Sequence, residues 1–280
     1  MPHLINGKAL SQKLNQELFE KVSLLEVKPT LHVVLIGDNP ASQIYVRSKQ
    51  RACALVGIES TIHVLDKNVE KQKVLELISA LNEDKNVHGI LLQLPLPSSF
   101  DTQEILEYLN PLKDVDGLHP QNAGLLMQGR PRFIPCTPHG CLKLIKTVIP
   151  DLKGTTVGIL GRSVLVGKPM AQLILNENAT LIHMHSFTKN VKDLCKLCDV
   201  LVVAVGKPHL IDKSYLKSNV VVIDVGINRL ENKKITGDVD FESALGSCQA
   251  ITPVPGGVGP MTIAGLLQNT YLAYQLAIPT

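Results

Sequence analysis

Nearly unbroken runs of branched apolar residues recur along this 280-residue chain, with helix-forming segments between them. Examples are LHVVLIG at 31–37, VHGILLQL at 87–94 and VLVVAV at 200–205. These runs do not alternate apolar with polar residues, as a strand with one exposed face would. Strands that are apolar on both faces belong to a parallel sheet covered by helices on both sides. The sequence therefore predicts an α/β fold.

The strand–helix pattern is interrupted between residues 110 and 138 by NPLKDVDGLHP and RPRFIPCTP, which are rich in the loop-forming residues Pro, Gly and Asp. The pattern restarts at TTVGIL, and a chain of this length can bury two cores. We predict an N-terminal parallel α/β domain at 1–138, completed by the terminal helix at 268–280. A Rossmann-like domain follows at 139–267, with a ligand cleft between the two.

Composition excludes several classes of protein. Hydrophobic residues make up 45% of the chain and charged residues 19%, which excludes a disordered protein. The net charge of +3 is too small to indicate nucleic acid binding, and no basic block with interleaved aromatics occurs. The N-terminus lacks the apolar core of a signal peptide, and no apolar run approaches the roughly 20 residues of a membrane span. We expect a cytoplasmic protein whose partners are neither nucleic acid nor membrane.

The six cysteines are scattered, and several lie in apolar segments, which predicts reduced, buried thiols. Cys195 and Cys198 form a CxxC motif just downstream of His183 and His185, so a metal site must be considered. A redox CxxC normally opens a helix after a strand, whereas this one closes a predicted helix before a strand. No second cysteine pair completes a zinc set. We expect no metal.

The glycine-rich loop GRSVLVGKP at 161–169 lies between the strand TTVGIL and a predicted helix. It is not a P-loop, because five residues instead of four separate Gly161 from Gly167, and Pro169 replaces the magnesium-binding hydroxyl. Its glycines are also too widely spaced for the dinucleotide fingerprint. Backbone amides at a helix N-terminus nevertheless attract phosphate. We predict a cofactor phosphate site here that uses Arg162 and Ser163, the alternative being an ordinary strand–helix turn.

The end of the next predicted strand indicates which dinucleotide binds. Enzymes that use NAD place an acidic residue there to hold the ribose hydroxyls. The segment HMHSFTK at 183–189 contains no Asp or Glu. A carboxylate would repel a 2'-phosphate, whereas Ser186 and Thr188 can donate hydrogen bonds to it and Arg162 can form a forked contact. The sequence therefore predicts NADP as the cofactor.

Polar residues in the first domain suggest a reactive site. Tyr45 and Lys49 are four residues apart on a predicted helix and share a face, although a solvated lysine beside a half-buried tyrosine is the common alternative. Gln93 ends an apolar strand, where ligands bind in open α/β sheets. Asp114 and Asp116 lie in a loop rich in Gly and Pro, so each is either functional or a turn former.

Seven motifs occur in a fixed order along the chain: IGDNPASQIYVRSKQRACALVGI, LLQLPLP, PLKDVDGLHPQNAG, PCTP, GRSVLVGKP, GDVDF and TPVPGGVGPMT. In order and spacing they resemble the bifunctional methylenetetrahydrofolate dehydrogenase/methenyltetrahydrofolate cyclohydrolase family. The resemblance begins at INGKAL and covers nearly the whole chain, with no region expected for the formyl-tetrahydrofolate ligase domain of longer relatives. It implies NADP-dependent oxidation of 5,10-methylenetetrahydrofolate and then hydrolysis to 10-formyltetrahydrofolate, within the one-carbon metabolism that serves purine biosynthesis.

The resemblance implies a role for each folate-site residue. Asp116 would hold the pterin ring, whose amino-pyrimidine edge presents adjacent donors to a carboxylate, and Tyr45 would stack on the ring system. Lys49 would move protons in the hydrolysis, and Gln93 would orient it. The segment VPGGVGP at 254–260 would form a wall without side chains. The predicted substrate-binding residues are Tyr45, Lys49, Gln93, Leu94, Asp116, Pro255, Gly256 and Gly257, and the predicted catalytic residues among them are Tyr45, Lys49, Gln93 and Asp116.

The resemblance also implies a homodimer, and we expect an isologous two-fold contact through the second domain. One alternative function is an NADP-dependent dehydrogenase of a small carbonyl or hydroxy substrate, of the shikimate or amino-acid type, which would leave KDVDG unexplained. Another is a non-catalytic nucleotide sensor, which the intact candidate catalytic residues argue against. The predicted cofactor-binding residues are Gly161, Arg162, Ser163, Val166, Gly167, Pro169, His185, Ser186, Thr188, Ala204, Val205, Gly206, Gly226 and Ile227.

Overall fold

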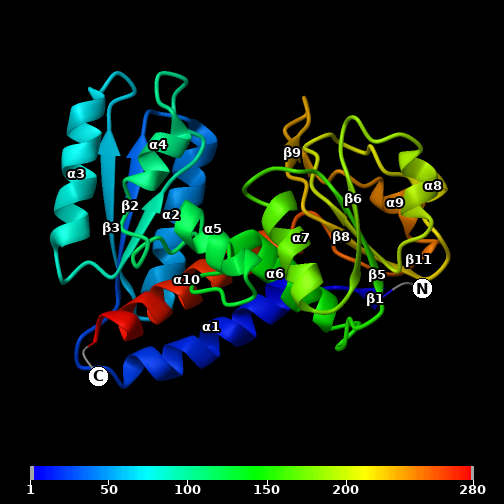
Figure 1. Ribbon diagram of the computed structural model, residues 1–280, viewed down its shortest axis with the longest axis horizontal. Coiled ribbons are helices and arrows are strands. Elements are labelled where there is room, and N and C mark those ends of the chain that lie inside the picture. Colours follow the sequence, from blue (N-terminus) through cyan, green and yellow to red (C-terminus); the bar gives the residue numbers. More distant parts are fainter. Residues whose placement is uncertain (1–2, 279–280) are drawn as a thin grey trace. The chain divides into compact units, whose positions relative to one another are not determined.

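The computed structural model describes residues 3–278 and separates into two compact units (Figure 1). The three-stranded unit comprises Lys13–Leu125, Pro131–Ile134 and the chain from Leu266 onward. The six-stranded unit comprises the chain up to Gln12, Leu126–Arg130 and Pro135–Gly265. Each unit contains a parallel sheet, so the predicted two-domain α/β fold is confirmed. Within residues 3–278, every helix is too short or too polar to cross a membrane.

The division between the units differs from the predicted domain boundaries. The helix α6 (Cys136–Lys146) lies wholly in the six-stranded unit, so the predicted boundary at residue 138 falls inside a helix. The N-terminal segment also belongs to that unit, because β1 (His3–Leu4) pairs in parallel with β11 (Cys248–Ile251). A two-residue strand has no detectable periodicity. Nothing in the sequence pattern therefore assigns this segment to the second sheet.

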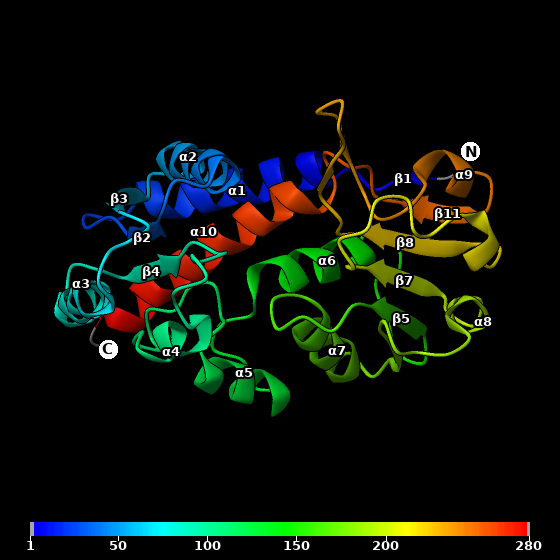
Figure 2. The ribbon, with the colours of Figure 1, turned by 90° about the horizontal axis from the view of Figure 1, so that it is seen from above.

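The three-stranded unit has the strand order β3-β2-β4, with all pairs parallel. Strand β2 is central and almost completely buried, whereas the edge strand β3 is partly exposed. The strands lie between α2 and α3 (Figures 1 and 2). Val34 and Ile36 of β2 pack with Val74 and Ile78 of α3 in a core that the apolar runs supply. The bounds are β2 Thr30–Ile36, β3 Glu59–Leu65, β4 Gly89–Leu92, α2 Pro40–Leu55 and α3 Lys71–Glu83.

Capping side chains mark the starts of two helices in this unit. Asn39 caps α2 by accepting hydrogen bonds from the amides of Ala41 and Ser42, and Pro40 occupies the first turn. Asp101 caps the short helix α4 (Thr102–Glu107) in the same way, by accepting hydrogen bonds from the amides of Gln103 and Glu104. The remaining helices that contribute to the three-stranded unit are α1 Gly7–Ser23, α4 Thr102–Glu107, α5 Pro120–Met127 and α10 Val258–Ala277.

The six-stranded unit has the strand order β1-β11-β8-β7-β5-β6, again parallel. Figure 2 shows β11, β8, β7 and β5 lying side by side in this order. The chain leaves β5 for β6 on one side and then crosses to β7 on the other, so the strand order reverses at β5. The bounds are β5 Thr156–Leu160, β6 Thr180–Met184, β7 Val200–Val203, β8 Val220–Asp224, α7 Gly167–Asn176, α8 Val191–Cys195, α9 Phe241–Ala244, the 3-10 helix η1 Lys213–Tyr215, and the hairpin strands β9 Asn228–Arg229 and β10 Ile235–Thr236.

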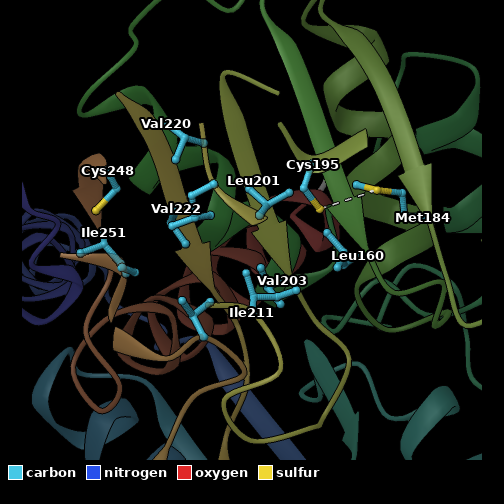
Figure 3. Packing of buried hydrophobic residues seen from close by; sticks show 13 residues of the cluster. Leu160, Met184, Cys195, Leu201, Val203, Ile211, Val220, Val222, Cys248 and Ile251 are labelled. Carbon is cyan, nitrogen blue, oxygen red and sulfur yellow. Dashed lines mark hydrogen bonds between the residues drawn. The ribbon is translucent and has the colours of Figure 1, made fainter. Parts of the chain in front are cut away.

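The core on one face of this sheet consists of branched side chains from the central strands, together with the three sulfur-containing residues Met184, Cys195 and Cys248 (Figure 3). The Cys195 thiol donates to the Met184 sulfur at 3.9 Å, and the Cys198 thiol donates to the Leu194 carbonyl at 3.3 Å. Burial raises the pKa of Cys195 to about 12 and that of Cys198 to about 11, so both are protonated packing groups. Like the other four cysteines, they are buried thiols.

Candidate active site

A pocket of about 430 Å³ opens at the carboxyl edge of the six-stranded sheet. Its lining includes Leu160 and Gly161 at the end of β5, Met184 at the end of β6 and Ala204 after β7. This is the point at which the strand order reverses, and ligands bind at such switch points in open α/β sheets. The pocket therefore lies where the loop GRSVLVGKP was predicted to bind a cofactor.

The unusual glycine spacing of this loop is explained by close backbone packing. Gly161 has a φ of +116°, and a Cβ there would collide with the carbonyl oxygen of Ala204. A Cβ on Gly167 would collide with the carbonyl oxygen of Gly161. The two glycines therefore allow the start of α7, the end of β5 and the turn after β7 to meet. Ser163 closes the loop between them, since its hydroxyl accepts a hydrogen bond from the Val166 amide at 3.1 Å.

The segment after β6 presents hydroxyl groups to the pocket, and Arg162 in the loop after β5 presents a cation. The Thr188 hydroxyl accepts a hydrogen bond from the His185 amide at 2.8 Å, which leaves its own proton to be donated elsewhere. The Arg162 guanidinium lies 5.3 Å from the centre of the Phe187 ring, an arrangement that holds it by cation–π attraction. Among the described residues that line the pocket, none is Asp or Glu. The electrostatic environment thus favours a phosphorylated ribose.

Eight of the fourteen predicted cofactor residues line this pocket: Gly161, Arg162, Ser163, His185, Ser186, Thr188, Ala204 and Val205. The other six lie outside its lining. Gly167 and Pro169 are buried in the first turn of α7, and Ile227 is 50% exposed. Gly226 packs against the carboxylate of Asp238. Val166 is the N-cap residue of α7, and Gly206 occupies the turn after β7 with a φ of +66°.

Several lining residues were not predicted from the sequence. Lys207 lies in the turn after β7. It could have been predicted, because residues that follow the carboxyl ends of strands at a switch point are candidates for ligand binding. Tyr215 comes from the short helix η1, whose sequence has no motif. The Lys192 ammonium nitrogen lies 5.5 Å from the centre of the Tyr215 ring. The other unpredicted lining residues are apolar and are Leu160, Met184, Val191, Leu210 and Ile211.

In the three-stranded unit, Lys49 and Gln93 are joined by a hydrogen bond. Lys49 Nζ donates to Gln93 Oε1 at 3.0 Å. Gln93 follows β4 directly and is 8% exposed, and its own Nε2 donates to the Leu94 carbonyl at 2.7 Å. That second bond fixes which end of the amide faces the lysine. The hydrogen bond between Lys49 and Gln93 that the resemblance implies is therefore present, and the role of Gln93 in orienting the lysine stays a prediction.

Tyr45 lies one turn before Lys49 on α2, with 38% of the residue exposed. Burial of the remainder raises the pKa of its phenol, so the ring carries no charge near neutral pH. A neutral, half-exposed aromatic ring beside a lysine offers a surface on which a flat heterocycle can stack.

The two acids of KDVDG have different environments. Asp114 is 1% exposed and accepts hydrogen bonds from the His119 amide at 2.8 Å and the Asn122 side chain at 2.9 Å. Burial raises the pKa of this carboxyl, and its contacts serve the loop. Asp116 is half-buried, and within residues 3–278 its carboxylate accepts no hydrogen bond. Asp116 is therefore the acid that remains available to a ligand.

The predicted glycine wall belongs to the six-stranded unit, and the other predicted folate residues belong to the three-stranded unit. The Gly256 carbonyl accepts a hydrogen bond from the Lys8 amide at 2.9 Å, and a Cβ on Gly7 would collide with the Gly257 carbonyl. These contacts hold Pro255–Gly257 against the start of α1. The structure thus brings together Tyr45, Lys49 and Gln93 in one unit and describes Pro255–Gly257 in the other.

Two protein-family models match this chain. The model of the tetrahydrofolate dehydrogenase/cyclohydrolase catalytic domain matches residues 5–116. The model of the NAD(P)-binding domain of the same family matches residues 135–278. The first match contains Tyr45, Lys49, Gln93 and Asp116, and the second contains all residues that line the pocket.

Similar proteins cover the chain almost completely. The bifunctional protein FolD of Acetivibrio thermocellus is 51% identical over 276 residues, which are 98% of this chain and 97% of that protein. The crystal structure of the bifunctional FolD methylenetetrahydrofolate dehydrogenase/cyclohydrolase from Campylobacter jejuni has a TM-score of 0.96 at 47% identity and covers 99% of this chain and 100% of its own. The Trypanosoma brucei dehydrogenase-cyclohydrolase, solved with NADP cofactor and an inhibitor, has a TM-score of 0.95 at 34% identity and covers 100% of this chain and 99% of its own.

Proposed function

The chain belongs to the tetrahydrofolate dehydrogenase/cyclohydrolase family, and we propose that its three-stranded unit holds the folate while its six-stranded unit holds NADP. It oxidises 5,10-methylenetetrahydrofolate to 5,10-methenyltetrahydrofolate with NADP and then hydrolyses this product to 10-formyltetrahydrofolate. The family models and relatives favour this activity over the alternative dehydrogenase of a small carbonyl substrate. The Lys49–Gln93 hydrogen bond at the end of β4 is the observation that best supports the assignment of the hydrolytic site.

The residues around the pocket suit NADP. Arg162 and Lys207 contribute positive charge, and Ser186 and Thr188 contribute hydroxyl donors for a phosphorylated ribose. When bound, NADP supplies the hydride acceptor for the oxidation. The chain contributes positioning to this step, because the apolar residues Leu210 and Ile211 and the glycine-rich turn define where the dinucleotide lies.

Hydrolysis requires proton transfers that Lys49 can perform. Water adds to the methenyl carbon while the Lys49 amine accepts the proton that the water loses. The tetrahedral adduct then opens at one carbon–nitrogen bond as its hydroxyl becomes the formyl carbonyl and releases its proton to solvent, and Lys49 returns a proton to the departing nitrogen. Gln93 keeps the amine directed at the reacting carbon through its 3.0 Å hydrogen bond. A positioned group of this kind typically accelerates such a step by about 10²- to 10⁴-fold.

Binding of the pterin falls to Asp116 and Tyr45. The Asp116 carboxylate accepts paired hydrogen bonds from the amino-pyrimidine edge, each contributing about 1.5 to 3 kcal/mol. Tyr45 stacks on the ring system. Leu94, in the same unit, adds an apolar contact for the folate. In the six-stranded unit, Pro255–Gly257 is proposed as a further folate-contacting segment, since glycines without side chains allow close approach of the backbone.

The active protein is proposed to be a cytoplasmic homodimer with an isologous contact through the six-stranded unit. Sedimentation at micromolar concentration tests the assembly, and a single monomeric mass would exclude it.

A coupled assay tests the function. Protein mixed with NADP and 5,10-methylenetetrahydrofolate should raise absorbance at the reduced-nicotinamide band, and 10-formyltetrahydrofolate should accumulate faster than methenyltetrahydrofolate hydrolyses spontaneously. Absence of NADPH formation, or a product that stops at methenyltetrahydrofolate, would contradict the proposal for the corresponding step.

A further inference from the structure

The motif GDVDF at 237–241 has no part in the chemistry described so far, yet its first acid is completely buried. Asp238 has 0% exposure and lies in the loop between β10 and α9. Its Oδ2 accepts hydrogen bonds from the amides of Val205 at 2.7 Å and Gly206 at 2.9 Å. Its Oδ1 accepts from the Lys207 amide at 2.9 Å and from the Asn228 side chain at 2.8 Å. One carboxylate thus binds three consecutive backbone amides.

Those three amides form the turn after β7, and this turn is a wall of the cofactor pocket. Val205 and Lys207 line the pocket directly. The preceding residue, Ala204, donates its amide to the Leu160 carbonyl at 2.8 Å and packs its own carbonyl against Gly161. The main chain of the motif also borders the pocket, because the lining residue Ile211 donates its amide to the Asp238 carbonyl at 3.1 Å. Residue 238 therefore contacts two separate parts of the wall.

A second buried acid holds Asp238 itself in place. Asp224, at the end of β8, accepts hydrogen bonds at Oδ1 from the amides of Gly226 and Asp238, both at 2.9 Å, and at Oδ2 from the Val239 amide at 2.9 Å. A Cβ at Gly226 would collide with the Asp238 carboxylate, and one at Gly237 would collide with the Asp224 carboxylate. The glycine of GDVDF is thus required by the same network.

We propose that Asp238 is a positioning residue for NADP, fixing the turn at 205–207 so that Val205 and Lys207 face the bound dinucleotide. This inference rests on the assignment of the pocket to NADP. It predicts an effect on cofactor binding and none on proton transfer at Lys49, since Asp238 acts only through the backbone of the turn.

Asp238→Asn tests the proposal with little change in shape. An amide has one acceptor oxygen, so its NH₂ group must face at least one backbone N–H of the turn, which has no acceptor to offer. We expect the KM for NADP to rise about 10- to 100-fold, as for the loss of hydrogen bonds to a charged group. The kcat at saturating NADP and the hydrolysis of added methenyltetrahydrofolate should each stay within a few-fold of wild type. A purely structural defect would instead lower both activities together by reducing the folded fraction.

Asp199→Asn is the matched control. Asp199 makes the same kind of bond at the opposite edge of the sheet, where its carboxylate accepts from the Thr156 amide at 2.8 Å and from Lys217 at 2.5 Å. This variant should leave the KM for NADP unchanged. An unchanged KM in folded Asp238→Asn, or an equal rise in both variants, would overturn the proposal.

Should Asp238→Asn fail to fold, Asn228→Ala decides the question. It removes only the fourth donor to the carboxylate and leaves the three backbone bonds to readjust. A rise of a few-fold in the KM for NADP supports the proposal, and an unchanged KM overturns it. Failure of the NADP assignment itself would appear differently, as absence of saturable NADP binding in the wild-type protein.

Discussion

The two units place their functional groups by different means. In the three-stranded unit, one side chain holds another, because Gln93 accepts from Lys49 while its amide is fixed by the next carbonyl along the chain. In the six-stranded unit, much of the pocket is shaped by backbone: glycines let the start of α7, the end of β5 and the turn after β7 meet, and a buried carboxylate holds that turn. A proton-transfer group must be aimed, whereas a dinucleotide needs a surface of defined shape. Substitutions in the first unit should therefore alter the chemistry, and those in the second should alter cofactor affinity.

The largest expected effect is that of Lys49→Gln. Glutamine retains hydrogen bonding but cannot exchange a proton near neutral pH, so cyclohydrolase activity should fall by about 10²- to 10⁴-fold. Dehydrogenase activity should remain measurable, and methenyltetrahydrofolate should become the end product. The assays are NADPH formation and enzyme-dependent decay of methenyltetrahydrofolate. Arg47→Gln, on the same helix and exposed, is the control and should behave as wild type in both. Equal loss of both activities in Lys49→Gln would make the lysine a positioning residue.

Asp116→Ala should affect both reactions, since they use the same bound pterin. We expect kcat/KM for methylenetetrahydrofolate oxidation and for methenyltetrahydrofolate hydrolysis to fall together by about 10- to 100-fold, as for the loss of a charged hydrogen bond. The affinity for NADPH, measured by fluorescence of the bound reduced cofactor, should not change. If either activity survived at the wild-type level, the pterin anchor would have to lie elsewhere.

Arg162→Ala should separate the two nicotinamide cofactors. The guanidinium can form a forked contact with the 2'-phosphate, which only NADP carries, so the KM for NADP should rise about 10-fold while that for NAD changes little. Lys168→Ala removes an exposed charge from the same loop without touching the pocket lining and serves as the control. Equal losses for NADP and NAD would show that Arg162 acts on the loop structure and not on the phosphate.

The smallest effect concerns the pH dependence of stability. Burial raises the pKa of Asp224 to about 6, so the folded protein keeps a proton that the unfolded chain releases from about pH 4 upward. Deprotonation of Asp224 therefore lowers the folding stability as pH rises through the range from about 4 to about 6. Above the folded-state pKa of about 6, this effect is complete. The free energy of unfolding of wild type relative to Asp224→Asn should drop by roughly 1 to 2 kcal/mol between pH 5 and pH 8. Urea titrations at several pH values measure this, and a constant difference would contradict the raised pKa.

The sequence predicts those parts of the molecule whose signals are local. Continuous apolar runs such as that at 31–37 predict buried parallel strands, and the four-residue spacing of Tyr45 and Lys49 predicts a shared helix face. The carboxyl end of a strand locates Gln93. Each of these signals depends on a few consecutive residues.

The rest depends on residues that are distant in sequence. Asp238 meets the amides of 205–207 across more than 30 residues, and no pattern links the two segments. Tyr215 reaches the pocket from a three-residue helix that has no periodicity. The two-residue β1 joins the sheet only through its pairing with β11. Even the acids of KDVDG look equivalent in the sequence, and burial alone separates Asp114 from Asp116.

The ratio of cyclohydrolase to dehydrogenase activity, measured at one subsaturating NADP concentration, tests the contrast between the two units most directly. In Lys49→Gln the ratio should fall by about 10²-fold or more, because proton transfer is lost and hydride transfer persists. In Asp238→Asn it should rise about 10-fold, because the cofactor binds less tightly while the hydrolytic site is intact. Opposite shifts are the predicted result. A shift in the same direction in both variants, or no shift in either, would contradict the account.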